Sequence, residues 1–312
     1  MRKKERKHKM KILSLTEPYA TLIKEKVKKV ETRSWKTNYR GEIYIHASKT
    51  KIPKATLEKQ ELMALCANHP LNFGKIICKA ELVDCIPMTK EYVLDMKQNH
   101  PQEYICGDYQ EGRYAFVLEN ISPIENPLEV KGKLGLWEYY TEDEIMEIMS
   151  QIEYGWVDKN QNPHQELGED FEKNYQLQSP SELLKSKIGV CYDQVELERY
   201  YFSSHLEKVT TYCIVYEAHD HHKTRTHTFL TYEKSGKYYW FEHAWENAKG
   251  IHEYPSLMDL FYDMKEKFII DQVKEEVEAN TIYFFEYQKP NWHLSAQEFF
   301  NHIIHGKERA CL

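Results

Sequence analysis

The sequence contains no pair of cysteines separated by two residues, and its seven cysteines are an odd number scattered along a long chain. This pattern does not support a zinc ribbon or a disulfide framework, and it favours free thiols in a reducing compartment. No apolar run approaches the ~18 residues that a membrane-spanning helix needs. The basic N-terminus is not followed by the apolar segment of a secretory signal. We therefore expect a cytoplasmic protein with no membrane segment.

Glycine-rich phosphate-binding loops, internal repeats and low-complexity tracts are also missing, and we expect no cofactor. What is present is the composition of an ordinary soluble globular protein, with 41% hydrophobic and 29% charged residues. A chain of 312 residues is long enough for two domains, each with its own hydrophobic core.

Charge is distributed unevenly along the chain. Residues 1–150 hold 25 Lys and Arg against 22 Asp and Glu, a net of +3, whereas the remainder holds 17 against 27, a net of −10. Most of the positive excess lies in a basic leader, residues 1–9. We expect this leader to be a disordered, solvated tail, and a phosphate-binding arm is the alternative.

The stretch from Lys187 to Phe202 reads as an apolar lead-in with a glycine, followed by a helix that carries Cys191 in its first turn. Apolar and aromatic side chains recur nearly all round this helix, which predicts that it is buried. Cys191 would then lie at the positive end of a central helix, where a negatively charged thiolate is favoured. The alternative is a cysteine that packs as a small buried hydrophobe.

Two segments after this helix, residues 226–232 and 237–245, alternate as strands do, and the four residues between them read as a turn. A four-residue loop places His227 directly opposite Glu242 on the neighbouring strand, close enough for the carboxylate to hold the imidazole. A loop one residue longer or shorter breaks this pairing. Cysteine, histidine and carboxylate in this order have the nucleophile, base and orienting roles of thiol hydrolases.

These three features, Gly189-Val-Cys191, Thr226-His227 and Tyr239-Trp-Phe-Glu242, resemble the transglutaminase-like superfamily of papain-fold enzymes, whose chain order is Cys, His, Asp. The resemblance covers roughly residues 143–312. It implies that Cys191 is the nucleophile and His227 the general base. Glu242 stands where the superfamily usually has Asp, as the residue that orients the imidazole.

The first part of the chain carries another ordered set of motifs, namely Ile12–Leu15, Lys28–Trp35, Arg40-Gly41, His46–Ser48 and Gly132–Trp137. Together they resemble the ASCH family, a small β-barrel of the PUA-like fold, over about residues 10–140. The resemblance implies a cleft beside the first helix and an RNA or nucleotide-like ligand. Some members resemble amidohydrolases with Lys and Thr at the Lys28 and Glu31 positions. Because Glu31 replaces that Thr, we expect binding here and no hydrolysis.

The ligand-binding set predicted for this cleft is Lys28, Glu31, Arg33, Trp35 and Arg40. Lys and Arg can hold phosphate, Glu can accept a hydrogen bond from a base amino group, and Trp can stack on a base. The alternative is a solvated surface strand on which Lys28, Glu31 and Arg33 are ordinary exposed charges.

The fold class expected is α+β, with an ASCH domain over residues 10–140 and a transglutaminase-like domain over residues 141–312. The boundary lies at a predicted helix that begins near Thr141, whose capping box is completed by Glu144. The run His219–His222 fits no metal-ligand spacing and is expected to be a solvent-facing loop, so we predict no metal site.

The function expected is a cysteine-dependent acyl transfer, in which a protein or peptide substrate is hydrolysed and the ASCH domain binds RNA or a nucleotide. One alternative is an RNA-binding protein whose second domain is a non-catalytic scaffold. Another is a protein-glutamine transglutaminase, in which an amine replaces water. In a third, the ASCH domain delivers the thiol enzyme to RNA or to a ribosome-associated protein.

Overall fold

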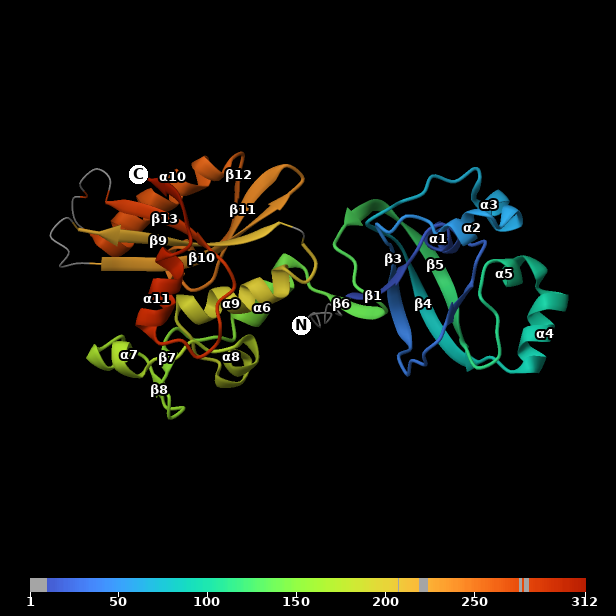
Figure 1. Ribbon diagram of the computed structural model, residues 1–312, viewed down its shortest axis with the longest axis horizontal. Coiled ribbons are helices and arrows are strands. Elements are labelled where there is room, and N and C mark those ends of the chain that lie inside the picture. Colours follow the sequence, from blue (N-terminus) through green and yellow to red (C-terminus); the bar gives the residue numbers. More distant parts are fainter. Residues whose placement is uncertain (1–9, 207, 219–223, 275–276, 278–280) are drawn as a thin grey trace, which may run out of the picture. The chain divides into compact units, whose positions relative to one another are not determined.

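The computed structural model describes residues 10–206, 208–218, 224–274, 277 and 281–312. The basic leader and the run His219–His222 therefore lie outside the described residues. The chain divides into two compact units, Met1–Tyr140 and Thr141–Leu312 (Figure 1). Within the part of the chain that is described, no helix combines the length and the apolar character needed to cross a membrane.

The first unit is built on a six-stranded sheet with strand order β2-β5-β4-β3-β1-β6. Strands β1 and β3 are parallel, and the other neighbours are antiparallel. The strands are β1 (Met10–Leu15), β2 (Val30–Arg33), β3 (Gly41–Ala47), β4 (Lys75–Pro87), β5 (Tyr114–Glu129) and β6 (Leu136–Tyr139). The helices are α1 (Tyr19–Lys24), α2 (Lys54–Leu57), α3 (Gln60–Cys66), α4 (Lys90–Asn99) and α5 (Pro101–Ile105).

The core of this unit forms where apolar side chains of the sheet meet helix α1. Leu13 and Leu15 of β1 and Ile43 and Ile45 of β3 are buried in one cluster, and Ile23 of α1 packs into it. The spacing of two residues on each strand is what places these side chains on the same face of the sheet. Helix α1 therefore lies against the sheet, just before the segment that holds the predicted ligand-binding residues.

The second unit is built on a six-stranded antiparallel sheet with strand order β12-β11-β10-β9-β13-β14. Its strands are β9 (Val209–Glu217), β10 (Thr224–Lys234), β11 (Lys237–Glu242), β12 (Gly250–Tyr254), β13 (Ile282–Tyr287) and β14 (Lys307–Cys311), and β7 (Trp156–Val157) pairs with β8 (Pro163–His164) in a separate ribbon. Its helices are α6 (Glu142–Met149), α7 (Glu169–Asn174), α8 (Pro180–Ser186), α9 (Cys191–Phe202), α10 (Leu257–Phe268) and α11 (Ala296–Ile304).

Helices cover both faces of this sheet, with α10 on one side and α9 and α11 on the other (Figure 1). The side chains of strand β9 explain why both faces are covered. Tyr212 and Ile214 belong to the core under α10. Cys213 and Val215, which alternate with them, belong to the core shared with α9 and α11. A strand buried on both faces reads as an almost continuous apolar run. Helix α9, with Cys191 as its first residue, therefore packs directly on the sheet.

The hairpin between β10 and β11 differs from the sequence prediction. The turn consists of two residues, Ser235 and Gly236, both with positive φ (53° and 78°), so that Leu230 pairs with Phe241. The predicted four-residue loop is wrong, and the register is displaced by two residues. Because side chains alternate with a period of two, this displacement leaves every side chain on its original face. His227 and Glu242 are thus diagonal neighbours on one face and are not directly opposed.

Candidate functional site

The N-terminus of α9 is fixed by a buried carboxylate two residues after Cys191. Asp193 accepts hydrogen bonds from the Val190 backbone N–H (3.1 Å), the Gln178 backbone N–H (2.8 Å) and the Tyr175 hydroxyl (3.0 Å). The bond from Val190 satisfies one of the free backbone donors at the helix start. Cys191 is thus held by contacts that reach back to residues before α8.

Burial raises the pKa of Asp193 to about 7, although the hydrogen bonds from Gln178, Tyr175 and Val190 oppose the rise. The neighbouring glycine is also required, because a Cβ at Gly189 would lie 2.6 Å from Leu183 Cδ1 and 2.9 Å from Asp193 Cβ. The Gly-Val-Cys motif therefore has a structural reason: only glycine leaves room for the carboxylate that positions the start of the helix.

The side chains of His227 and Glu242 meet across β10 and β11. Nε2 of His227 lies 2.8 Å from Glu242 Oε2, and both residues are buried. Glu242 is held by two further donors, the Trp240 indole N–H (3.1 Å) and the Trp245 backbone N–H (2.8 Å). With its oxygens engaged in this way, the carboxylate fixes the orientation of the imidazole ring.

The thiol of Cys191 also acts on this imidazole, because it is one of the groups that raise its pKa. Burial works against the charged form of His227, but the Glu242 carboxylate and hydrogen bonds with Cys191 and Glu242 outweigh it and raise the pKa of His227 to about 10. Because Nε2 faces Glu242, Nδ1 is the ring nitrogen left for the sulfur. The structure therefore brings the three residues of the predicted triad together, from α9, β10 and β11.

A second contact ties helix α9 to the strand that carries the imidazole. The Tyr192 hydroxyl lies 2.9 Å from Thr226 Oγ1. The residue after Cys191 is thus hydrogen-bonded to the residue before His227. The ring of Trp245 packs edge-on against His227, with 5.4 Å between the ring centroids. These contacts restrict how far the sulfur and the imidazole can separate.

A cavity of about 830 Å³ opens beside the imidazole. Its wall includes His227, Thr226, Gln194, His243, Trp245 and Tyr154. Apolar and hydrogen-bonding side chains are mixed in this wall, as expected of a site that both encloses and orients a small part of a substrate. A molecule bound in the cavity would lie against the His227 imidazole.

Helix α9 is less apolar than the sequence indicates. Four of its polar side chains, Asp193, Gln194, Glu196 and Glu198, are almost fully buried, whereas the aromatic Tyr200 is 60% exposed. Sequence reasoning missed these polar residues and His243. One feature of the sequence could have indicated them: polar residues occur in the first two turns of a helix whose pattern predicts burial. Buried polar groups need hydrogen-bond partners, so such residues predict a polar network.

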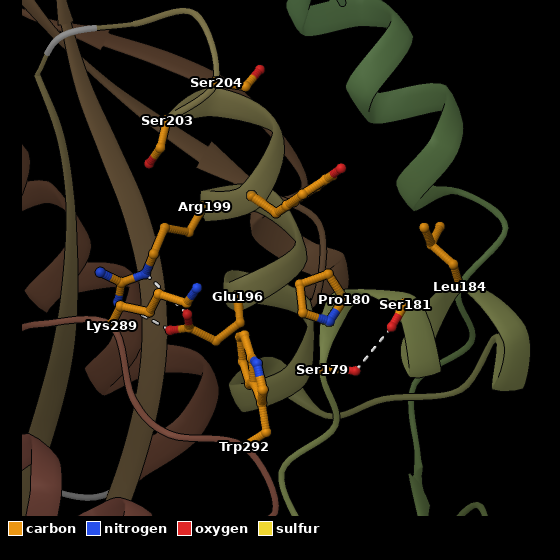
Figure 2. A pocket seen from close by; sticks show the side chains of 11 residues that line it. Ser179, Pro180, Ser181, Leu184, Glu196, Arg199, Ser203, Ser204, Lys289 and Trp292 are labelled. Atoms are coloured by element: carbon orange, nitrogen blue, oxygen red, sulfur yellow. Dashed lines mark hydrogen bonds and ion pairs between the residues drawn. The ribbon is translucent and has the colours of Figure 1, made fainter.

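A separate cavity of about 520 Å³ lies along another part of α9 (Figure 2). Its wall contains a buried ion pair in which Arg199 Nε lies 3.0 Å from Glu196 Oε2. Burial raises the pKa of Glu196, and the Arg199 charge opposes the rise. Lys289 lies over the Trp292 ring at 5.2 Å from its centroid. The charges at the base of this cavity are thus paired within the protein.

In the first unit, Lys28 is completely buried. Its ammonium group donates to the Val30 carbonyl (2.5 Å) and the Cys106 carbonyl (2.8 Å), and it lies 3.3 Å from Glu31 Oε2. Glu31, 8% exposed, also contacts Arg33 Nε at 3.1 Å. The solvated-strand alternative is therefore wrong for Lys28 and Glu31, and the three charges form one connected chain.

Trp35 and Arg40 are not part of that chain of contacts. The Trp35 ring packs edge-on against Phe116, with centroids 5.1 Å apart. Arg40 is exposed and pairs with Asp84 at 2.9 Å. Of the five residues predicted to bind a ligand, the structure joins Lys28, Glu31 and Arg33, and it gives Arg40 a separate partner. Their role in ligand binding stays a prediction.

The family comparison concerns the first unit. Residues 13–128 match the model of the ASCH domain family. Activating signal cointegrator 1 is 26% identical over 132 residues in Mus musculus and 32% identical over 138 residues in Homo sapiens. Each match covers 40% of this chain, but only 21% and 24% of the respective relatives. The chain therefore spans less than a quarter of the length of these curated relatives.

Two solved structures of ASCH from Zymomonas mobilis, the protein and a point mutant, are similar to the chain with 21% and 20% sequence identity. They cover 46% of this chain and 80% and 83% of their own chains, with a TM-score of 0.26 for each. The family match itself is specific to residues 13–128. We conclude that the N-terminal part of this chain is an ASCH domain, with the PUA-like fold.

Proposed function

We propose that residues 141–312 form a cysteine-dependent acyl-transfer domain of the transglutaminase-like kind, joined to the ASCH domain. The observation that carries the proposal is the His227 imidazole, which is 2.8 Å from a buried carboxylate and whose pKa is raised by that carboxylate and by the thiol at the first residue of α9. This arrangement has the parts of a nucleophile, a base and an orienting group. The cavity beside His227 would hold the acyl donor.

In the first half of the proposed reaction, the Cys191 thiolate attacks the carbonyl carbon of a carboxamide or peptide bond. A C–S bond forms, and the carbonyl electron pair moves to oxygen. The backbone N–H of Cys191 has no intrahelical partner at the helix start, so it can donate to this oxyanion. His227 gives its proton to the departing nitrogen, the C–N bond breaks, and an amine leaves a thioester behind.

In the second half, water attacks the thioester and gives a proton to His227, the thiolate departs, and a carboxylic acid is released. The Glu242 carboxylate stabilises the charged imidazole, because it raises the pKa of His227 to about 10 against the effect of burial. The imidazole is therefore charged at pH 7. The first proton transfer, to the leaving amine, then needs no further activation of the ring.

Replacement of water by an amine turns the same cycle into protein transamidation. The two outcomes share Cys191, His227 and Glu242, and they differ in the molecule that releases the thioester. We favour hydrolysis. Mass analysis of the products from a glutamine-containing peptide, with and without a primary amine, separates them: a new carboxylate indicates hydrolysis, and an added amine indicates transfer.

The experiment that tests the proposal is competitive alkylation of the full-length protein by limiting iodoacetamide, followed by peptide mapping of all seven cysteines. We expect Cys191 to react faster than the other six thiols, because a neighbouring imidazolium favours the reactive thiolate form. Cys213, which is fully buried, is the matched control. If the reactivity of Cys191 equals that of Cys213, the proposal fails.

A second candidate is supported by the ASCH match over residues 13–128: the chain binds RNA or a nucleotide, and the second unit is a non-catalytic scaffold. In this candidate, Arg33→Ala and Arg40→Ala weaken binding of a single-stranded RNA, and the affinity falls with rising salt. Lys97→Ala, on helix α4, is the control for a general loss of charge. Fast, His227-dependent alkylation of Cys191 argues against a scaffold role for the second unit.

A further inference from the structure

His243 follows the triad carboxylate and forms part of the wall of the same cavity as His227. Its side chain is only 5% exposed, and among the described residues its Nε2 atom has no hydrogen-bond partner. An unpaired buried polar atom costs about 1–3 kcal/mol. Such an atom in the wall of a cavity calls for an explanation.

The protonation of this ring follows from its neighbours. The Gln194 side chain donates from Nε2 to the Gly189 carbonyl at 2.8 Å, because a carbonyl can only accept. The remaining amide atom of Gln194, Oε1, is then an acceptor, and it lies 2.6 Å from His243 Nδ1. Nδ1 must therefore carry the proton, and a neutral His243 has its lone pair on Nε2.

The charge of the ring agrees with this assignment. Burial lowers the pKa of His243 to about 4, and the Lys249 ammonium acts in the same direction, while Glu242 and Glu246 act against it. At pH 7 the ring is neutral. His227 and His243 thus differ in charge within one cavity, because only His227 has a carboxylate in direct contact with its ring.

Gln194, which accepts the hydrogen bond from His243, is also close to the thiol of Cys191. Gln194 lies three residues after Cys191 in α9, so these two residues are neighbours on the helix surface. The hydrogen bond from His243 to Gln194 joins the ring to that first turn, and the bond from Gln194 to Gly189 joins it to the loop before the thiol. Among the described residues no group donates to Nε2, and the ring lines the cavity, so a molecule bound there can supply the donor.

We propose that Nε2 of His243 accepts a hydrogen bond from an N–H group of the bound substrate, so that the triad takes amides in preference to the corresponding esters. This inference rests on the proposed function. It assigns His243 the role of a specificity-determining residue, which orients the substrate through its amide nitrogen without taking part in bond making or breaking. An ester of the same shape lacks the N–H group and leaves Nε2 unpaired.

The test uses two reagents of matched shape, N-ethyl iodoacetamide, which has an N–H group, and ethyl iodoacetate, which has an oxygen in its place. Second-order rate constants for alkylation of Cys191 are measured with the full-length wild-type protein and with His243→Phe, and each is divided by the rate constant for glutathione. We expect the amide-to-ester ratio of the protein to fall about five- to tenfold in the variant, the value of one hydrogen bond. An unchanged ratio overturns the inference.

Two further measurements separate this inference from the proposed function. His227→Ala is expected to slow both reagents equally; if it slows neither, the proposed function fails first. NMR of ¹⁵N-labelled histidine in the wild type is expected to show a neutral ring with the proton on Nδ1 for His243 at pH 7. A ring protonated on Nε2 contradicts the inference without any variant, so a folding defect in His243→Phe leaves it testable.

Discussion

Glu242→Gln is the substitution whose consequences the structure defines best. The variant keeps the size of the side chain and removes the charge that faces His227 at 2.8 Å. The pKa of His227 is raised from 6.5 to about 10 in the folded protein, so its contribution to stability is fully present below pH 6.5 and is lost as the pH rises through about 10. We therefore expect the stability difference between wild type and variant to depend on pH.

The magnitude follows from the same pair. One pKa unit corresponds to ~1.4 kcal/mol, and removal of one partner of a buried ion pair typically costs about 3–5 kcal/mol. We expect Glu242→Gln to lower the free energy of unfolding by about 3 kcal/mol at pH 6 and by less than about 1 kcal/mol at pH 10.5. Urea titrations followed by tryptophan fluorescence at both pH values measure the two differences.

The matched control is Glu253→Gln, on strand β12, where the carboxylate pairs with Lys237 and Tyr239 at the surface. Little change is expected at either pH, because exposed ion pairs contribute little. A loss for Glu242→Gln that is the same at pH 6 and pH 10.5 would refute the assignment of a charged imidazole. A loss no larger than that of Glu253→Gln would refute the buried pair itself.

Three other substitutions test the surrounding structure through the midpoint of thermal or urea unfolding. Lys28→Met should lower the free energy of unfolding by about 2–4 kcal/mol, because it leaves the buried Glu31 with one charge partner fewer. Lys29 is exposed, so Lys29→Met is the control and should change the free energy of unfolding little. Equal effects of the two substitutions contradict the burial of Lys28. Gly236→Ala should cost about 1 kcal/mol because its φ is 78°, and Gly168→Ala, whose Cβ would meet nothing within 4 Å, is its control. Asp193→Ala should lower the free energy of unfolding more at pH 5 than at pH 8. The pKa of Asp193 is raised to about 7 in the folded protein, so the wild type loses stability as the pH rises from about 4 to about 7. An equal loss of stability at both pH values contradicts this.

The main elements of the fold were predictable where periodicity is strong. Strands with alternating or continuous apolar patterns, such as β9, and the capped helix α6 follow from local sequence. The hairpin register was not predictable in the same way. Glu233 and Lys234 look like turn residues because they are polar, yet they continue strand β10 at the partly exposed end of the sheet, and the turn needs only two residues with positive φ.

The three residues of the candidate site could be singled out from the sequence, whereas the residues that support them could not. Cys191, His227 and Glu242 stand out by residue type and order. Gln194 and His243 do not, because their hydrogen bond joins residues 49 positions apart and no local pattern records it. Burial of polar groups depends on partners that only the tertiary structure supplies.

The proposed function requires that the imidazole of His227 links the sulfur of Cys191 to the carboxylate of Glu242. It is tested most directly by labelling the full-length wild type and His227→Ala with a thiol-directed peptide electrophile, with the extent of Cys191 modification measured by mass spectrometry. His305→Ala, at the exposed C-terminal end of α11, is the matched histidine control. We expect strong labelling of the wild type and loss of most of it in His227→Ala; equal labelling of the two would show that His227 does not act on Cys191.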